Sequence, residues 1–390
     1  MTIQQKPPGL FTLWSVAHSL YAGKARAYLI KKGVPFRELY PPHPGYRARA
    51  VAAAKVEVIP ILETPEGEFI QDTTDIIEFV EARFSEPQMI PDTPVQRAVA
   101  WLLEAFGSEY LLPLAMHYRW SYRTEQETFL RAEFGRVTYA GPDREAARQS
   151  GQRYMDYFSG FLPALGVTPE TIPALETSYA ELLNALDVHL QRFPYLLGGR
   201  PSVADFGLMA PMFAHLGRDP VPAGLMKTTA PNVFRWTERM NRSQISDGEF
   251  FDLPETYFPN DEIPPSLEAV LALVFKDWGP ELAANMDRFS TWLKTEPRPS
   301  AGQIVSRDGL RRVHPSLGWI HYDWNGQSMR RASAPHTLWH FDRAADHARG
   351  LEGEAKRRFS ALARRTGGEL VMSLRLPRPL KREDSALVLG

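Results

Sequence analysis

The sequence contains no cysteine among its 390 residues. This absence excludes disulfides, thiolate metal sites and a cysteine nucleophile. Any thiol chemistry must therefore use a sulfur that arrives with a substrate. No stretch approaches the ~20 consecutive apolar residues of a membrane-spanning helix, and residues 1–9 are polar with two prolines instead of an apolar signal core. We therefore expect a cytoplasmic protein without a membrane partner.

A strong net charge is also absent. Lys and Arg number 45 and Asp and Glu number 46, which leaves a net charge of −1. The chain has no long-range field that would attract polyanions, so we do not expect nucleic acid as a partner. With 44% hydrophobic and 11% aromatic residues, the composition is typical of a soluble globular protein. The length predicts two or three domains.

Hydrophobic periodicity predicts an α/β domain over residues 10–85, preceded by a flexible terminus over residues 1–9. Ser19 and Gly33 are residue types typical of the two ends of a helix, and Pro65-Glu66-Gly67 is typical of a hairpin turn. The predicted order is βαβαββα, with strands at 10–14, 35–40, 59–63 and 68–70 and helices at 20–32, 46–55 and 72–84.

A linker is predicted over residues 86–94, an all-helical domain over residues 95–250 and an α+β extension over residues 251–390. In the extension, Asn325-Gly326 predicts a two-residue hairpin turn, because both residues tolerate positive φ angles. Alternating apolar residues at 370–376 predict a strand. The predicted helices lie at 95–120, 143–165, 169–192, 202–217, 231–240 and 265–293.

The segment over residues 11–33 resembles the first strand, loop and helix of serine-type glutathione S-transferases. Ser19 precedes Lys24-Ala25-Arg26 at the spacing of that family's motif. The resemblance implies that Ser19 is catalytic: its hydroxyl and the helix dipole would stabilise a glutathione thiolate, because a free thiol has a pKa near ~8.5. The structural alternative is a helix N-cap. Ser15, His18 and Tyr21 are rival donors.

A second resemblance lies in Val58-Ile59-Pro60-Ile61-Leu62 and Gln71-Asp72-Thr73, which are similar to the family's V-P-x-L hairpin and its acidic-hydroxyl pair. It implies that Ile59, before a cis Pro60, binds the cysteinyl backbone of glutathione by strand addition. Asp72 would face the γ-glutamyl ammonium, and Thr73 would bind its carboxylate. Glu57-Val58 departs from the family pattern, which leaves Lys55 and Arg47 as candidates for the glycyl carboxylate.

A third resemblance, at residues 198–206, is to the family's helix start in the helical domain, where we interpret Ser202 and Asp205 as a capping box without a catalytic role. Together the motifs imply a thioredoxin-like N-terminal domain and an all-α C-terminal domain of the glutathione S-transferase type. They cover about residues 10–240, so the extension lies outside the standard family.

The resemblance implies a cytoplasmic, homodimeric glutathione S-transferase of the kind used in detoxification, with glutathione as co-substrate and a small hydrophobic electrophile as second substrate. Tyr110, His117 and Tyr118 would line the acceptor site, with core packing as the alternative. Other hypotheses are a glutathione-dependent lyase, dehalogenase or isomerase, and a non-enzymatic adapter. We expect no metal: we interpret His336, His340 and His347 as surface or packing residues, because no HExxH motif is present.

Overall fold

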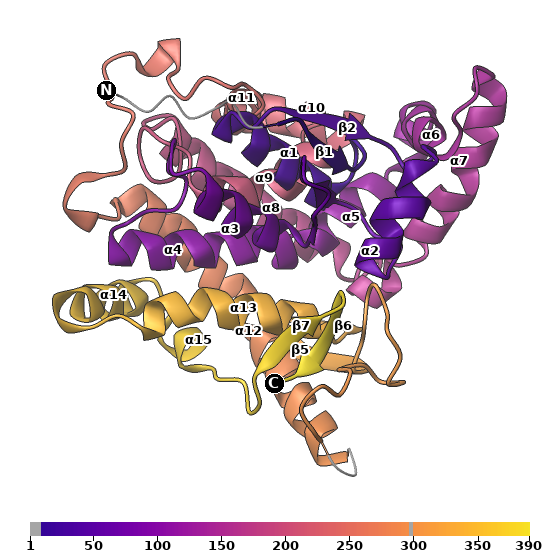
Figure 1. Cartoon of the computed structure of the whole chain (residues 1–390). Coiled ribbons are helices and arrows are strands. Elements are labelled where there is room, and N and C mark those ends of the chain that lie inside the picture. Colours follow the sequence, from indigo (N-terminus) through magenta and orange to yellow (C-terminus); the bar gives the residue numbers. More distant parts are fainter. Residues whose placement is uncertain (1–8, 296–298) are drawn as a thin grey trace.

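The computed structural model of the chain describes residues 9–295 and 299–390. The predicted terminal segment 1–9, apart from its last residue, lies outside this part of the chain. The described residues form a thioredoxin-like domain, a helical domain and a C-terminal extension that packs against both (Figure 1).

The thioredoxin-like domain has the predicted βαβαββα order. The sheet has the strand order β2-β1-β3-β4, in which β1 runs parallel to β2 and antiparallel to β3. Instead of one regular helix over 46–55, the structure has a π-helical segment followed by a single α-helical turn. The elements are β1 (Phe11–Trp14), α1 (Leu20–Lys32), β2 (Phe36–Leu39), η1 (Tyr46–Val51), α2 (Ala52–Ala54), β3 (Ile61–Glu63), β4 (Phe69–Gln71) and α3 (Thr73–Arg83).

The helical domain contains two helices, α6 and α10, that the periodicity analysis missed. The helix predicted over 95–120 is interrupted by η2, where a Cβ on Gly107 would lie 2.5 Å from the backbone of Gly207, so the close approach of η2 and α9 requires glycine. The elements are α4 (Pro94–Ala105), η2 (Phe106–Tyr110), α5 (Leu112–Trp120), α6 (Arg123–Thr138), α7 (Arg144–Ser159), η3 (Pro163–Leu165), α8 (Ile172–Leu190), α9 (Val203–Ala214), α10 (Pro220–Thr229) and α11 (Pro231–Met240).

The extension begins after two short turns, η4 (Gly248–Phe250) and η5 (Pro259–Asp261). The predicted hairpin at Asn325-Gly326 is confirmed, with φ angles of 52° and 79° at the turn. The elements are α12 (Pro265–Thr295), β5 (Trp319–Trp324), β6 (Gln327–Ala332), α13 (Pro335–Arg349), α14 (Gly353–Arg365), α15 (Glu369–Ser373), β7 (Leu380–Glu383) and β8 (Ala386–Leu389).

The predicted strand over 370–376 is wrong, because residues 369–373 form helix α15. The apolar residues that suggested alternation do not share a buried face. Leu370 is 83% exposed, whereas Val371 is 7% exposed and packs in the main hydrophobic core. The helical turn buries Val371 and leaves Leu370 in solvent. A strand with Leu370 on its core face would instead have buried Leu370.

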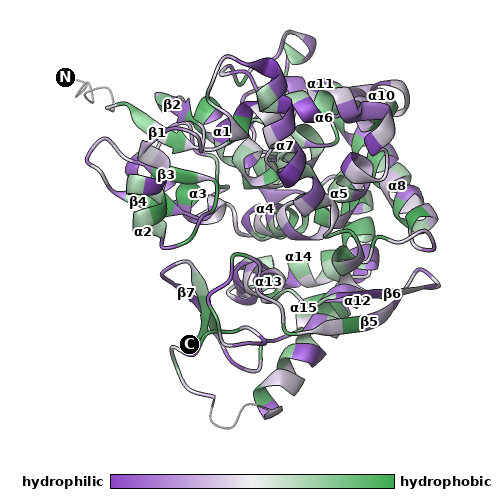
Figure 2. Ribbon diagram, turned by 90° about the vertical axis from the view of Figure 1, so that its right-hand side faces the viewer, coloured by the Kyte–Doolittle hydropathy of each residue, from purple (hydrophilic) through white to green (hydrophobic). Residues whose placement is uncertain are grey.

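The extension lies as a layer along one side of both preceding domains (Figures 1 and 2). Helix α13 packs along α4 and η2, and α12 packs along α8. A second hydrophobic core inside the extension contains Phe289, Trp292, Leu338 and Leu387. The extension therefore shares the main core with the preceding domains and adds a second core of its own.

Candidate functional site

Ser19 lies at the start of α1, in the loop that follows β1. Its side-chain oxygen accepts a hydrogen bond from the Ala22 N–H at 3.4 Å, so Ser19 is the N-cap of the helix. A hydroxyl that accepts such a bond still has its own hydrogen to donate. Because Ser19 is only partly buried, this hydrogen is available to a ligand at the positive end of the α1 dipole.

Two of the three rival donors are constrained by neighbours. The hydroxyl of Ser15 donates to Glu38, which also pairs with Arg26. The ring of His18 lies 4.2 Å from the ring of Phe134, and burial lowers the pKa of His18 well below its usual value. The structure thus leaves Ser19 with the more available hydroxyl of the two serines.

The third rival, Tyr21, lies near acidic side chains. Burial, followed by the nearby carboxyls of Glu109 and Asp72, raises the pKa of Tyr21 well above its usual value. A phenol in these surroundings remains protonated at neutral pH and can act only as a hydrogen-bonding group.

Arg119 of α5 holds the loop that precedes Ser19. Its Nη1 donates to the carbonyl of His18 at 2.9 Å, and its guanidinium forms a buried ion pair with Asp219 at 2.6 Å. The Ala214 carbonyl accepts a further hydrogen bond from Arg119 at 2.7 Å. The helical domain therefore fixes the position of the Ser19 loop.

Ile59 and Pro60 lie just before β3 and are joined by a cis peptide bond, as the resemblance implied. Ile59 is partly buried, and in the part of the chain that the structure describes no hydrogen bond uses its backbone N–H or C=O. Free backbone groups beside a strand can pair with an extended peptide.

The candidates for the glycyl carboxylate are engaged with acidic residues. Lys55 Nζ lies 2.8 Å from a carboxylate oxygen of Asp384 in the β7–β8 turn, and Arg47 pairs with Glu57 at 3.1 Å. Both pairs are exposed, and such pairs contribute little free energy, so a competing carboxylate could displace them.

Asp72 and Thr73 lie at the start of α3. Asp72 has a φ of 85° and accepts a hydrogen bond from the Thr74 N–H at 2.8 Å, as an N-cap does. Burial raises the pKa of Asp72, but His340, Arg382, Lys24 and the Thr74 N–H together lower it below its usual range. The carboxyl is therefore ionised at neutral pH.

Sequence reasoning missed the groups that the rest of the molecule brings to this position. His340 and Arg382 come from the extension, and Glu109 comes from η2. Arg382 donates to the carbonyl of Gln71 at 2.8 Å, next to Asp72. His340 was interpreted as a surface or packing histidine, and no local pattern singled out Glu109 or Arg382.

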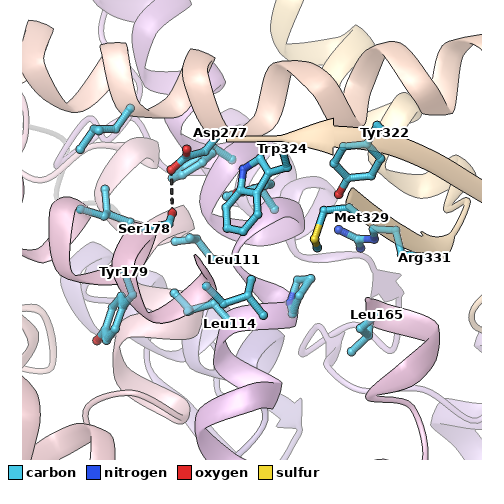
Figure 3. Close-up of a pocket in the computed structure, with 16 residues that line it drawn as sticks. Leu111, Leu114, Leu165, Ser178, Tyr179, Asp277, Tyr322, Trp324, Met329 and Arg331 are labelled. Carbon is cyan, nitrogen blue, oxygen red and sulfur yellow. Dashed lines mark hydrogen bonds between the residues drawn. The ribbon is translucent and has the colours of Figure 1, made fainter. Parts of the chain in front are cut away.

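A pocket lies between the helical domain and the β5–β6 hairpin (Figure 3). It contains Tyr110, one of the three predicted acceptor-site residues. Ser178 donates to Asp277 at 2.7 Å on one side of Trp324, and Arg331 pairs with Glu281 at 2.8 Å on the other. The lining residues from the extension are Leu273, Asp277, Tyr322, Trp324, Met329 and Arg331.

The other two predicted acceptor-site residues do not line this pocket. The His117 ring nitrogens lie 2.9 Å from the Ser121 hydroxyl and 3.1 Å from the Glu176 carboxylate. Tyr118 stacks on Tyr122, with ring centroids 5.8 Å apart. Both residues pack between α5 and α8, so the structure does not bring them together with Tyr110.

Ser202 and Asp205 form the predicted capping box at the start of α9. Asp205 also accepts hydrogen bonds from the Leu196 N–H at 3.1 Å and from Trp236 Nε1 at 3.0 Å. This motif is structural. Over the described residues, no helix is long and apolar enough to cross a membrane, and no group of three or more His, Asp or Glu side chains is placed to hold a metal ion.

Comparison with known proteins identifies the class. The family model of the glutathione S-transferase N-terminal domain matches residues 13–88, and that of the C-terminal domain matches residues 169–239. These matches identify the thioredoxin-like and helical domains as N-terminal and C-terminal domains of the glutathione S-transferase type. Residues 240–390 lie beyond both models.

Solved structures similar to this chain share little sequence with it, and no curated protein matches the sequence. They include a Tau class glutathione S-transferase from mango, Mangifera indica (16% identity, 67% of this chain, 95% of that chain, TM-score 0.37). A glutathione S-transferase from Methylobacterium radiotolerans in complex with glutathione sulfonate has 17% identity (66% of this chain, 100% of that chain, TM-score 0.36). FzlA from C. crescentus has 18% identity to this chain (66% of this chain, 98% of that chain, TM-score 0.38).

Proposed function

We propose that this protein is a glutathione transferase that activates the thiol of glutathione for attack on a small hydrophobic electrophile. The observation that carries the proposal is the position of Ser19. Its partly buried hydroxyl caps α1 and retains a hydrogen to donate at the positive end of the helix. A donor and a helix dipole both stabilise a thiolate and thereby lower the pKa of a bound thiol.

The remaining parts of a glutathione molecule have partners in the same domain. The unpaired backbone groups of Ile59 would bind the cysteinyl residue. Asp72, ionised at neutral pH, would face the γ-glutamyl ammonium, and Thr73, at the first position of α3, would bind the carboxylate. Lys55 would exchange Asp384 for the glycyl carboxylate.

The electrophile would bind in the pocket that contains Tyr110. Trp324 Nε1 and Arg331 Nε are buried donors without a hydrogen-bond partner in the described part of the chain. Because an unpaired buried donor costs free energy, an electrophile that carries an acceptor oxygen next to an apolar body fits the pocket best.

A glutathione-dependent lyase, dehalogenase or isomerase would use the same thiolate on another electrophile. The non-enzymatic adapter is favoured by one observation: the extension covers α4 and α8 with a folded layer that the family models do not include. Homodimer formation, a cytoplasmic location and a role in detoxification follow from the resemblance and belong to the same proposal.

Retention on immobilised glutathione followed by turnover assays with a panel of electrophiles tests the proposal. We expect retention, elution by free glutathione, and conjugate formation detected by mass spectrometry. Retention without conjugation would favour the lyase, dehalogenase or isomerase, whereas a protein that is not retained would favour the adapter.

A further inference from the structure

Three parts of the chain that are far apart in sequence meet at His340. Its Nε2 lies 3.8 Å from Asp72 Oδ2, at the start of α3, and 3.6 Å from Glu109 Oε1, in η2. His340 itself belongs to α13 of the extension. Two carboxyl groups therefore flank one imidazole nitrogen at distances too long for direct hydrogen bonds.

These carboxyl groups have few partners. Glu109 Oε2 accepts one hydrogen bond, from the Thr337 hydroxyl at 3.3 Å, and Asp72 accepts one from the Thr74 N–H at 2.8 Å. In the part of the chain that the structure describes, no Lys or Arg nitrogen lies within 4.0 Å of either carboxyl group. Carboxyl groups in partly enclosed positions are usually paired with a cation, and neither of these two has such a direct partner among the described residues.

Nearby cations lower the pKa of Asp72, but among the described residues no lysine or arginine forms an ion pair with Asp72 or Glu109. Burial and repulsion by Asp72 raise the pKa of Glu109 to about 8, and burial lowers the pKa of His340 to about 4. At neutral pH the ionised Asp72 therefore faces a neutral carboxylic acid and a neutral imidazole. The other charged or titratable groups that face the cluster are Tyr21, Lys24, Asp75, Glu104, Arg331, His336, Arg343 and Arg382.

The cluster is not completely enclosed by protein. The side chains of Asp72 and Glu109 keep 15% and 9% of their surface exposed, and Tyr21 beside them is only partly buried. A primary ammonium suits this position because it carries three donor hydrogens and one positive charge for two carboxyl groups and an imidazole.

We propose that Asp72, Glu109 and His340 together bind the α-ammonium of a γ-glutamyl ligand, so that the extension is part of the ligand site. This inference rests on the proposed function, in which Asp72 faces that ammonium, and adds one residue from the helical domain and one from the extension. The two added residues would make the site specific for ligands that carry a free α-amino group.

Proton balance follows from this arrangement. Before binding, the Glu109 carboxyl group is protonated, because burial and the neighbouring Asp72 favour its neutral form. When the ammonium arrives, the Glu109 O–H bond breaks, the proton passes to solvent, and the resulting carboxylate pairs with the ammonium. Binding near neutral pH should therefore release up to one proton per ligand.

Titration calorimetry with two probes, S-methylglutathione and its des-amino analogue (glutaryl in place of γ-glutamyl), tests the proposal. Measurement at pH 7 in two buffers of different ionisation enthalpy gives the proton release. For the wild-type chain we expect about tenfold tighter binding of the amino-bearing probe and release of protons with that probe only.

In Glu109→Gln the preference for the amino-bearing probe should fall about tenfold and the proton release should vanish, while binding of the des-amino analogue stays within about twofold. His340→Asn should also reduce the preference for the amino-bearing probe. If Glu109→Gln does not fold, this variant provides the test instead. Glu81→Gln, at a lysine-paired glutamate in the helix that Asp72 caps, is the matched control and should retain the wild-type values.

If Glu109→Gln lost affinity for both probes to the same extent, Glu109 would have a purely structural role and the inference would be overturned. An unchanged preference with unchanged proton release would overturn it as well. A wild-type chain that binds neither probe would instead reject the proposed function, and the inference with it. Urea unfolding of each variant confirms that it is folded before titration.

Discussion

Lys24 of α1 and Glu104 of α4 form an ion pair that is buried between the thioredoxin-like and helical domains, with side-chain exposures of 0% and 2%. The hydroxyls of Thr74 and Ser108, each 3.2 Å from Lys24 Nζ, complete the surroundings of the ammonium. Lys24 belongs to the Lys-x-Arg motif that accompanies Ser19. In the structure this motif residue joins the two domains.

Lys24→Met should destabilise the chain by about 3–5 kcal/mol, because it leaves the Glu104 carboxylate buried without a cation. The double variant Lys24→Met/Glu104→Met should recover most of this loss, since two apolar side chains need no charge partner. Urea unfolding of the wild type and the two variants measures both effects. A double variant as unstable as the single one would show that the pair itself stabilises the domain contact.

Ser19→Gly separates a catalytic hydroxyl from a helix cap. Glycine is a tolerable N-cap but has no hydroxyl to donate a hydrogen bond. The free energy of unfolding should therefore change by only about a few tenths of a kcal/mol. Turnover should fall, and the rising limb of the pH–rate profile should move to higher pH because the bound thiol loses its donor. Turnover and a pH profile like those of the wild type would place thiolate activation at Ser15, His18 or Tyr21.

The absence of cysteine predicts that no mixed disulfide forms between this chain and glutathione. Incubation with oxidised glutathione should leave the intact mass of the protein unchanged, and thioltransferase activity through such an intermediate should be absent. Mass spectrometry after incubation measures the first outcome, and a coupled reductase assay measures the second. An added mass of one glutathione, removed by a reductant, would contradict the prediction.

The homodimer is predicted by the resemblance alone. Light scattering at micromolar concentration should give twice the mass of one chain. A single-chain mass would contradict the prediction, and the extension would supply the reason, because its helix α13 packs along α4 and its helix α12 along α8. Those faces of the helical domain are then no longer free to contact another chain.

Much of the thioredoxin-like domain could be predicted because its helices and strands begin and end at residues that favour a helix cap or a turn. Ser19 and Gly33 bound α1, and in the extension the turn at Asn325-Gly326 follows from residue types that tolerate positive φ angles. The cis bond before Pro60 was implied by the family resemblance and not by the residue types alone. The segment over 370–376 could not be assigned in this way. Its alternation of apolar residues did not show that Leu370 would remain in solvent.

The group around His340 could not be predicted for a different reason. Asp72, Glu109 and His340 meet only because α13 packs along α4 and η2, and no pattern within any one of these segments encodes that contact. A motif identified Asp72, whereas Glu109 lies in an interrupted helix without a motif. Long-range packing between the extension and the two preceding domains therefore decides which side chains surround Asp72.

The titration of Glu109 provides a last test, in which stability and binding change in opposite directions. Burial and repulsion by Asp72 raise the pKa of Glu109 to about 8 in the folded chain, from 4.5 for an unperturbed glutamate. The unfolded chain therefore loses this proton first as the pH rises. The contribution of Glu109 to stability is fully present below about pH 4.5 and is lost progressively up to about pH 8.

Glutamine does not titrate, so Glu109→Gln should be more stable than the wild type, and the difference should grow with pH across this window to on the order of a few kcal/mol. Urea unfolding at the two ends of the window measures the difference in the free energy of unfolding. Parallel curves for the two proteins would show that Glu109 does not titrate in this range. A variant that is more stable at the alkaline end yet binds S-methylglutathione more weakly would show that the buried carboxyl group is retained for ligand binding rather than for folding, because a structural residue would lose stability and binding together.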